Sequence, residues 1–515
     1  MKKMYEFISR ITEMYGRKIE DKTIKTKTEL TASLENNISC IKEAFSGSSD
    51  LTVHQLDLRG IRGAVISIDN MINKDMLAQG ILRPLYAYSF SGDAEKCLTD
   101  IEYKLLYTDD IKEITTFEEV HQFIMSGFAV IAVEGCNKML TVGIQGYRTR
   151  GISEPQSDVI QRGSKEGFVE ALRTNITLVR RRIKSTKLKC EIITAGNISG
   201  TELCICYLAG TASDEILAEL RKRIAAIDLD TILAAGYLVP YLEDSGVNSP
   251  FRGVGITERP DTLCGKMTEG RIGILIDGVP SALIVPYLFA EYFQTLDDYS
   301  NRPYFAVFTR LLKFAAFFIS VLLPGFYTSL GTFDPEMFPT LTLNKIAVSI
   351  AGTPMSLMSE TLLILLVYEI MRESGLRMPQ PLGYAVSIVG GLVIGDTAIN
   401  AGLIGAPTLM VVAISAICSY IIPNLYAPAA ILRILFTIAG GIGGIWGLSA
   451  VFCMVFVELC AKTSFGIPYT SPITPPGVSA LRDVFIRAGW KTLSKKQERI
   501  QNMPGSEVKE KCQNV

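Results

Sequence analysis

The side chains that could do chemistry in this 515-residue sequence are few, and the most unusual of them lie in its apolar part. Glu360 is within the apolar segment Ile346–Met371, and Asp396 and Asn400 are four residues apart, so they share one face of a helix. An ionisable group at membrane depth costs roughly 2.5–3.5 kcal/mol on insertion scales. Each of these residues therefore needs an explanation.

Two interpretations of these polar residues stay open. In one, they line a water-filled path for ions or solutes; the candidates are Glu360, Asp396, Thr397 and Asn400. In the other, they form hydrogen bonds between packed helices. Nearby, Glu369, Arg372 and Glu373 lie at positions i, i+3 and i+4. This spacing of charged residues is typical of a cluster at the membrane interface.

Glycines in the same part of the chain recur as pairs of small residues four apart. Such pairs let helix backbones approach closely in lipid. The contact could lie within one chain or between subunits around a pore, and the sequence favours neither. The pairs are Gly391/Gly395, Gly440/Gly444 and Gly443/Gly447.

No motif for catalysis or cofactor binding is present. The sequence has no phosphate-binding loop, dinucleotide fingerprint, zinc-protease helix or nucleophile elbow. Its 11 cysteines are odd in number, and Cys204-x-Cys206 has neither redox nor zinc spacing, so we expect reduced, packed thiols. Arg180–Arg182 lacks interleaved aromatics and indicates a solvated face or a subunit contact. We expect no enzyme, no cofactor and no metal site.

The charge distribution divides the chain. Lys and Arg number 51 against 52 Asp and Glu, and the mean hydropathy is +0.28. Only ten ionisable residues fall between Phe314 and Val457, so the rest of the chain carries nearly all the charge. This pattern excludes a purely soluble enzyme, a disordered chain and a nucleic-acid binder that relies on bulk positive charge. It predicts an integral membrane protein with a large soluble region.

The soluble region is predicted to be α+β, with two α/β modules in series. A polar lead-in (1–25) precedes a first module (26–150) and a second module (151–300). Helices are expected over 30–45, 71–88, 164–184 and 213–226. Strands are expected over 51–58, 63–69, 128–135, 138–145, 188–194 and 201–208, with two more joined by a turn at Asp277-Gly278. The start of the chain lacks a signal-peptide pattern, so we expect both modules in the cytosol.

An all-α polytopic membrane domain (301–462) and a basic tail (463–515) are predicted to follow. About five apolar segments are visible: Phe314–Phe333, Ile346–Met371, Leu382–Ile404, one near 406–423, and Ile434–Val457. Five full crossings would leave the basic tail on the side away from the modules. Either one segment is broken or re-entrant, with Ile346–Met371 and the glycine-rich last one as candidates, or the charge rule fails here.

Several motifs, in one order along the chain, resemble the A subunits of GerA-type spore germinant receptors. In the soluble region they include Glu154-Pro155, the run from Arg162 and Gly163 to Glu170, Asn175, the run Glu258-Arg259-Pro260-Asp261, Gly270-Arg271, Asp277-Gly278 and Asp298-Tyr299. In the apolar part they are Glu369–Pro379, Gly395–Ala398 and Ala401–Leu403. One departure is Pro250-Phe251-Arg252-Gly253, where a second proline is expected after the phenylalanine.

The resemblance implies a multi-pass protein of the spore inner membrane that acts with a B subunit and a lipoprotein C subunit. It implies a homo-oligomer, a pentamer, that forms a nutrient-gated channel for monovalent cations in the lipid bilayer. It implies no nucleic acid as a partner. Two other functions stay open: a scaffold that assembles the receptor without conducting, and an ion-coupled solute carrier.

Overall fold

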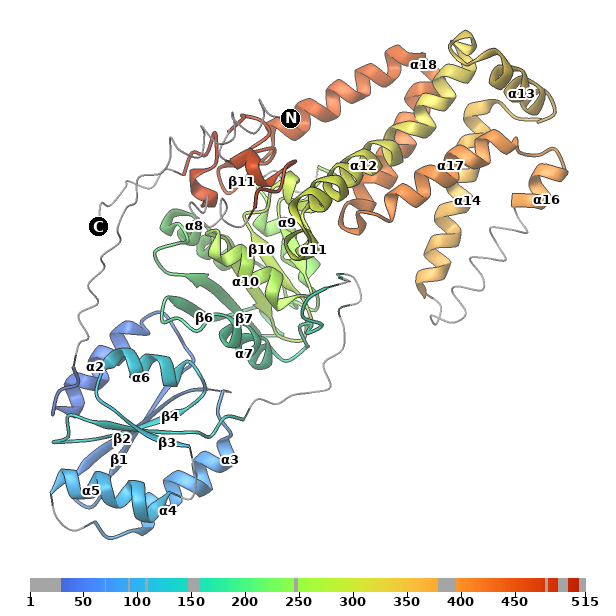
Figure 1. Ribbon diagram of the computed structural model, residues 1–515. Coiled ribbons are helices and arrows are strands. Elements are labelled where there is room, and N and C mark those ends of the chain that lie inside the picture. Colours follow the sequence, from blue (N-terminus) through green and yellow to red (C-terminus); the bar gives the residue numbers. More distant parts are fainter. Residues whose placement is uncertain are drawn as a thin grey trace. The chain divides into compact units, whose positions relative to one another are not determined.

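The computed structural model describes residues 29–69, 71–90, 93–106, 110–146, 155, 158, 160, 162–244, 249–377, 395–477, 480–489 and 499–508 (Figure 1). These residues form two compact units. The first comprises the chain up to Glu43, Thr52–Ile68 and Ile72–Gln145; the second comprises Ala44–Leu51, Asp69–Met71 and the chain from Gly146 onward. The predicted polar lead-in lies outside the described residues.

The first unit is built around a five-stranded sheet in the order β1-β2-β4-β5-β3. Its strands are β1 Leu51–Asp57, β2 Arg62–Ile68, β3 Ile111–Ile114, β4 Ala129–Val133 and β5 Met139–Val142. Its helices are α2 Leu34–Ala44, α3 Lys74–Met76, η1 Leu77–Leu82, α4 Arg83–Ala87, α5 Ala94–Asp100, η2 Ile101–Leu105 and α6 Phe117–Ile124. Strand β4 is buried on both faces because helices cover the sheet on each side. The predicted hairpin at Cys136-Asn137 is confirmed by the pairing of β4 with β5.

A second sheet, in the order β6-β7-β9-β10-β8, forms the core of what we call the second-sheet module, residues 162–300. Its strands are β6 Leu188–Ala195, β7 Thr201–Leu208, β8 Gly255–Thr257, β9 Ile272–Ile276 and β10 Ala282–Val285. Its helices are α7 Leu172–Arg182, α8 Asp214–Ala225, η3 Ala235–Tyr237, α9 Val239–Leu242, α10 Pro260–Thr268, η5 Phe289–Phe293 and α11 Leu296–Ser300. Helices α7 and α10 pack on one face of this sheet and α8 and α9 on the other (Figure 1).

The helix predicted over 164–184 is wrong in its first half, because α7 begins only at Leu172. The side chain of Asn175 turns back and bonds the backbone of Val169 at both its N–H (2.8 Å) and its carbonyl (2.6 Å). These are groups that a helix would use, so α7 does not extend back over the preceding residues. Asp277 then accepts from the first helical N–H, that of Leu172, at 3.0 Å and caps the helix.

The apolar part consists of helices of very different length. They are α12 Pro303–Thr332, η6 Pro335–Met337, α13 Thr340–Ala351, α14 Leu357–Arg377, α16 Gly395–Asn400, α17 Ala406–Ser419, η8 Pro423–Leu425 and α18 Tyr426–Ala461. Among the described residues, two helical stretches are long and apolar enough to cross a membrane by length and composition, Pro303–Thr332 and Pro423–Ala461. The sequence predicted about five such segments, and one of them, Leu382–Ile404, is described only from Gly395 onward.

Contacts between these helices give their directions relative to α12, which starts at the second-sheet module (the near end) and runs to the far end. Leu357, at the start of α14, packs on Tyr327 near the end of α12, whereas Glu369, later in α14, contacts Tyr426. Helix α14 therefore runs back toward the near end. Helix α17 also runs back, because Thr408 bonds Tyr327 and, seven residues on, Ser415 bonds the carbonyl of Ser320.

Helix α18 is two helices joined at Gly444. Gly444 has φ +58° and ψ −147°, a conformation outside the helical region that favours glycine. Leu425 and Ala429 pack with Phe314 and Phe317 at the near end, and Gly444 meets Phe333 at the far end. Leu448, beyond the break, is back beside Gly325. The last apolar segment is thus a helical hairpin, and the segment Ile346–Met371 is also broken, between α13 and α14.

Candidate functional site

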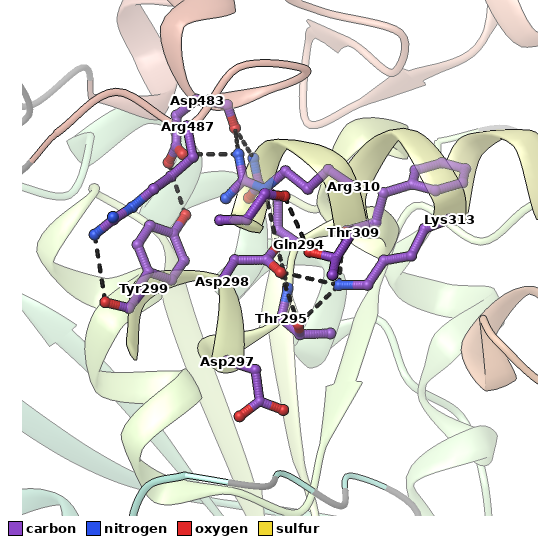
Figure 2. Close-up of polar contacts among 12 residues, drawn as sticks. Gln294, Thr295, Asp297, Asp298, Tyr299, Thr309, Arg310, Lys313, Asp483 and Arg487 are labelled. Atoms are coloured by element: carbon purple, nitrogen blue, oxygen red, sulfur yellow. Dashed lines mark hydrogen bonds and ion pairs between the residues drawn. The ribbon is translucent and has the colours of Figure 1, made fainter. Parts of the chain in front are cut away.

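A group of charged side chains joins three parts of the second unit where α12 begins, and we call it the junction cluster (Figure 2). Arg310, on α12, is fully buried; its guanidinium donates to Asp298 Oδ2 at 2.8 Å and to Asp483 Oδ1 at 2.9 Å. Asp298 belongs to α11, and Asp483 ends the 3-10 turn η9 Ala480–Asp483. One side chain thus links the second-sheet module, the first long apolar helix and the tail. The cluster consists of Asp298, Tyr299, Arg310, Lys313, Asp483 and Arg487.

Local sequence fixes Asp298 in place. Thr295 and Asp298 form a capping box at the start of α11, in which the Thr295 N–H and hydroxyl both donate to the Asp298 carboxylate at 3.3 Å. Lys313 donates to the same carboxylate at 3.2 Å (Figure 2). Asp298 is therefore held by groups from two helices.

On the tail side of the junction cluster, the polar side chains are also paired by hydrogen bonds. The Tyr299 hydroxyl donates to Asp483 Oδ2 at 2.7 Å, and Arg487 donates to the carbonyls of Tyr299 and Asn301 at 3.3 and 3.2 Å. Burial and the neighbouring Asp483 carboxylate raise the pKa of Tyr299 well above its usual value, so it remains a donor. Arg310 thus contacts both carboxylates and Lys313 contacts one of them, so that buried Asp298 and partly buried Asp483 each face a cation.

The tail also pairs with the second-sheet module. Strands β11 Thr463–Ser464 and β12 Ile467–Pro468 follow α18 directly, and Thr463 donates to Asp244 at 2.8 Å. The N–H of Ile500, in η10 Ile500–Asn502, donates to the carbonyl of Glu269 at 2.9 Å. Lys462 lies beside Glu243 and the carbonyl of Phe251, and burial lowers its pKa. The chain therefore leaves the module at α12 and returns to the same module after α18.

Glu360, a predicted path residue, is fully buried between helices. Its Oε1 accepts from the backbone N–H of Gly405 at 2.8 Å, where α17 begins, so the positive end of the α17 dipole faces the carboxylate. Among the described residues, its Oε2 has no hydrogen-bond partner. A Cβ on Gly405 would lie 2.7 Å from Ser349 Oγ and 3.3 Å from Glu360 Oε1, so several oxygens converge at this glycine.

The three residues of the predicted charge cluster around Glu369 do not share one set of partners in the structure. Tyr426 donates to both carboxylate oxygens of Glu369 at 2.8 and 2.7 Å, and buried Arg433 lies 3.6 Å from it. Arg372 lies over the Tyr426 ring at 3.4 Å from its centroid. Glu373 instead pairs with Arg377 at 2.7 Å on an exposed surface. Glu369 therefore joins α14 to α18, a contact that the sequence analysis did not anticipate.

Three other predicted path residues lie on the short helix α16. Asp396, Thr397 and Asn400 are all exposed, whereas Glu360 is buried. Their common side faces away from the described helices. The proposal that they line a path stays a prediction.

Most of the predicted packing glycines in the described residues make close contacts within the chain, and Gly443 is the exception. A Cβ on Gly440 would collide with the Gly325 carbonyl of α12, and one on Gly447 would collide with the Ala439 carbonyl across the α18 hairpin. Gly444 forms the hairpin turn, and Gly395 approaches Leu409. Gly391 lies outside the described residues.

The motif residues of the second-sheet module hold its loops together. The Arg259 guanidinium bonds Asp261 at 2.6 Å and the carbonyl of Ser164 at 2.5 Å. Arg271 and Lys266 enclose buried Glu291, and burial, which would raise the pKa of Glu291, is outweighed by these two cations, so that its pKa is lowered. Each of these side chains has a structural partner.

The remaining motif residues have backbone roles. Arg162 donates its N–H to Asp297 at 3.1 Å, the Glu170 carbonyl accepts from Gly278 at 2.8 Å, and the Glu258 carbonyl accepts from Phe168 at 2.7 Å. Pro260 is the first residue of α10, and Gly163 and Gly270 have φ of +152° and +94°. The motif therefore indicates a shared fold more than a binding pocket.

Comparison with known proteins identifies that fold. A family model described as "Bacillus/Clostridium GerA spore germination protein" matches residues 39–499. The chain belongs to this GerA family. The resemblance drawn from the motifs is thereby confirmed.

Curated relatives of this GerA-family chain match along most of their length. Spore germination protein KA of Bacillus subtilis (strain 168) is 34% identical over 476 residues, covering 92% of this chain and 87% of that protein. Spore germination protein B1 of the same organism is 30% identical over 492 residues, covering 94% and 100%. The solved N-terminal domain of the A subunit of the Bacillus megaterium spore germinant receptor GerK3 is 29% identical, covers 52% of this chain and 99% of that one, and gives a TM-score of 0.40.

Proposed function

We propose that this GerA-family chain is the A subunit of a spore germinant receptor, which responds to nutrient germinants and conducts monovalent cations when gated. The junction cluster is the observation that carries the proposal. Arg310 lies on α12 and is bonded both to the second-sheet module and to the tail. A displacement of the module must therefore either move the helices or break a buried ion pair. This arrangement suits a receptor whose soluble part controls its membrane part.

Polar groups among the helices support a path for cations. Glu360 offers a carboxylate oxygen without a hydrogen-bond partner among the described residues, and Asp396 and Asn400 are exposed on α16. Carboxylate, hydroxyl and amide oxygens are the ligands that hard cations prefer. In a homo-oligomer, a pentamer in this proposal, the exposed faces of α16 from several chains would surround the path.

The course of the chain suits a multi-pass protein of the spore inner membrane. The chain is at the far end after α12, at the near end after α14, at the far end again at Gly405 and at the near end after α17. The two halves of α18 add one passage out and one back. If the chain also returns to the far end between α14 and Gly405, this proposal has six passages. An even number would remove the conflict with the basic tail, because modules and tail would then both face the cytosol.

Purified chain in a planar bilayer, recorded with and without added nutrient germinants, tests the proposal. We expect cation currents from the wild type, and a several-fold lower conductance for Asp396→Asn with unchanged abundance of the oligomer. Glu336→Gln, which removes an exposed acid near the far end of α12, is the control and should conduct like the wild type. A silent wild-type oligomer would reject the channel.

Two rivals make different predictions in the same preparations. A scaffold that only assembles the B and C subunits would capture them without any conductance. A carrier would accumulate labelled nutrient in vesicles in fixed proportion to the ions moved, whereas a channel passes ions far in excess of nutrient.

A further inference from the structure

Three cysteine sulfurs lie together inside the second-sheet module. Cys204 and Cys206 are two residues apart on β7 and therefore face the same side of the sheet, and Cys190 on β6 is paired directly with Cys206. The sulfur of Cys206 lies 3.6 Å from that of Cys204 and 4.0 Å from that of Cys190, and all three sulfurs are within 4.8 Å of one another. The strand register adds the third thiol to the pair visible in the sequence.

These separations match those of a three-coordinate metal thiolate. An ion bonded to three sulfurs at about 2.3 Å in a flat triangle holds the sulfurs about 4.0 Å apart. The described sulfurs could therefore take up an ion with only small changes of their side chains. No movement of β6 or β7 is required.

The surroundings decide which ion fits. The three thiols are at most 1% exposed and face an apolar layer formed with α7 and α10. The neighbouring thiol, Cys264, is directed to the carbonyl of Val179 at 3.9 Å. Structural zinc sites take four ligands, whereas soft Cu(I) is stable with three thiolates and needs no water.

Positive charge is available beside the three thiols. The fully buried Arg180 guanidinium interacts electrostatically with Cys190. It is held by hydrogen bonds to Asp50, one of them 2.6 Å long. Because Asp50 already pairs with this guanidinium, Arg180 offsets only part of the negative charge of an ion held by three thiolates.

We propose that Cys190, Cys204 and Cys206 bind one soft d¹⁰ metal ion, Cu(I), inside the second-sheet module. The ion enters as the β6–β7 hairpin closes during folding, with release of the thiol protons to solvent, and it then stabilises the closed hairpin. The site lies on the sheet and not among the apolar helices, so it does not depend on the channel proposal.

The full chain, expressed with copper in the medium and purified under reducing conditions, tests this site. Metal analysis should find about one copper per chain in the wild type. The copper content per chain should be at least tenfold lower in Cys190→Ser. Cys264→Ser, which alters a thiol of the same apolar layer outside the triad, should retain it.

X-ray absorption of the copper-loaded wild type gives a second measurement that does not depend on any variant. Three sulfur neighbours at about 2.3 Å are expected. Absence of copper in the wild type, zinc in its place, nitrogen or oxygen neighbours around copper, or retention of copper by a folded Cys190→Ser chain would each overturn the proposal.

Discussion

Arg310 is the side chain on which the junction cluster depends most. Its charge is fully buried and is satisfied only because α11 and the tail each present a carboxylate. Removing one partner of a buried ion pair costs about 3–5 kcal/mol, because the remaining charges lose their compensation. Arg310→Ala should therefore lower the free energy of unfolding by about that amount in denaturant titration of the purified chain.

The matched control for Arg310 is Arg302, an exposed arginine just before α12. Arg302→Ala should change the stability by less than about 0.5 kcal/mol. Equal losses for the two variants would mean that the junction cluster contributes no more than a surface charge.

Glu291 predicts an acid-sensitive second-sheet module. Its pKa is lowered below the usual 4.5, because Arg271 and Lys266 outweigh the effect of burial. In acid the unfolded chain then binds this proton more readily than the folded one, so the stabilisation is present above pH 4.5 and is lost as the pH falls below it. Melting temperatures measured at a series of pH values from 7 to 3.5 should fall once the pH is below 4.5.

Replacement of the acid separates this group from others that titrate. Glu291→Gln should lower stability at pH 7, since two buried cations lose their partner, and should flatten the fall below pH 4.5. Glu215→Gln, at an exposed position on α8, should leave the wild-type profile unchanged. If the stability of Glu291→Gln fell below pH 4.5 as steeply as that of the wild type, Glu291 would not be the group responsible for the fall.

At the scale of elements, the break in α18 depends on a single glycine. The Gly444 backbone conformation costs other residues about 1–3 kcal/mol, and an added Cβ would press on Phe333 at 3.2 Å. Gly443, its neighbour, has no atom within 4 Å of an added Cβ. We expect Gly444→Ala to lower the melting temperature and Gly443→Ala to leave it unchanged or raise it slightly.

The same pair of variants tests the hairpin itself. If α18 were one straight helix, alanine at Gly444 would stabilise it as much as alanine at Gly443 does. Thermal unfolding followed by circular dichroism in detergent distinguishes the two cases.

Local patterns predicted the soluble elements well, because alternation and turn residues act over short distances. The hairpin at Asp277-Gly278 and the helix over 213–226 are confirmed. The helix over 164–184 was wrong in its first half because the Asn175 side chain competes for the Val169 backbone, an effect that composition does not reveal. The sequence predicted a break in one of two apolar segments without locating it, and the structure has a break in both, at Gly444 and between α13 and α14.

The candidate site was harder to predict, because its partners are distant in the sequence. Glu360 is recognisable in the sequence as an acid in an apolar segment, but the sequence left open whether it lines a water-filled path or packs between helices. Asp483 lies 173 residues from Arg310, so nothing in the sequence pairs them. Cys190 likewise joins Cys204 and Cys206 only through the strand register. A charged residue just inside a long apolar helix, such as Arg310, is the signal that could have drawn attention to the junction.

At the scale of the whole molecule, the course of the second unit predicts on which side of a membrane each end of the helices lies. Met337 follows α12 at the far end and is 64% exposed, whereas Ile486 lies in the tail beside the second-sheet module and is 63% exposed. In intact cells, a membrane-impermeant maleimide should therefore label Met337→Cys, and it should label Ile486→Cys only after the membrane is permeabilised. The chain without either substitution gives the background from its native cysteines. An odd number of passages would expose Ile486→Cys together with Met337→Cys, and labelling of both in intact cells would reject the six-passage course.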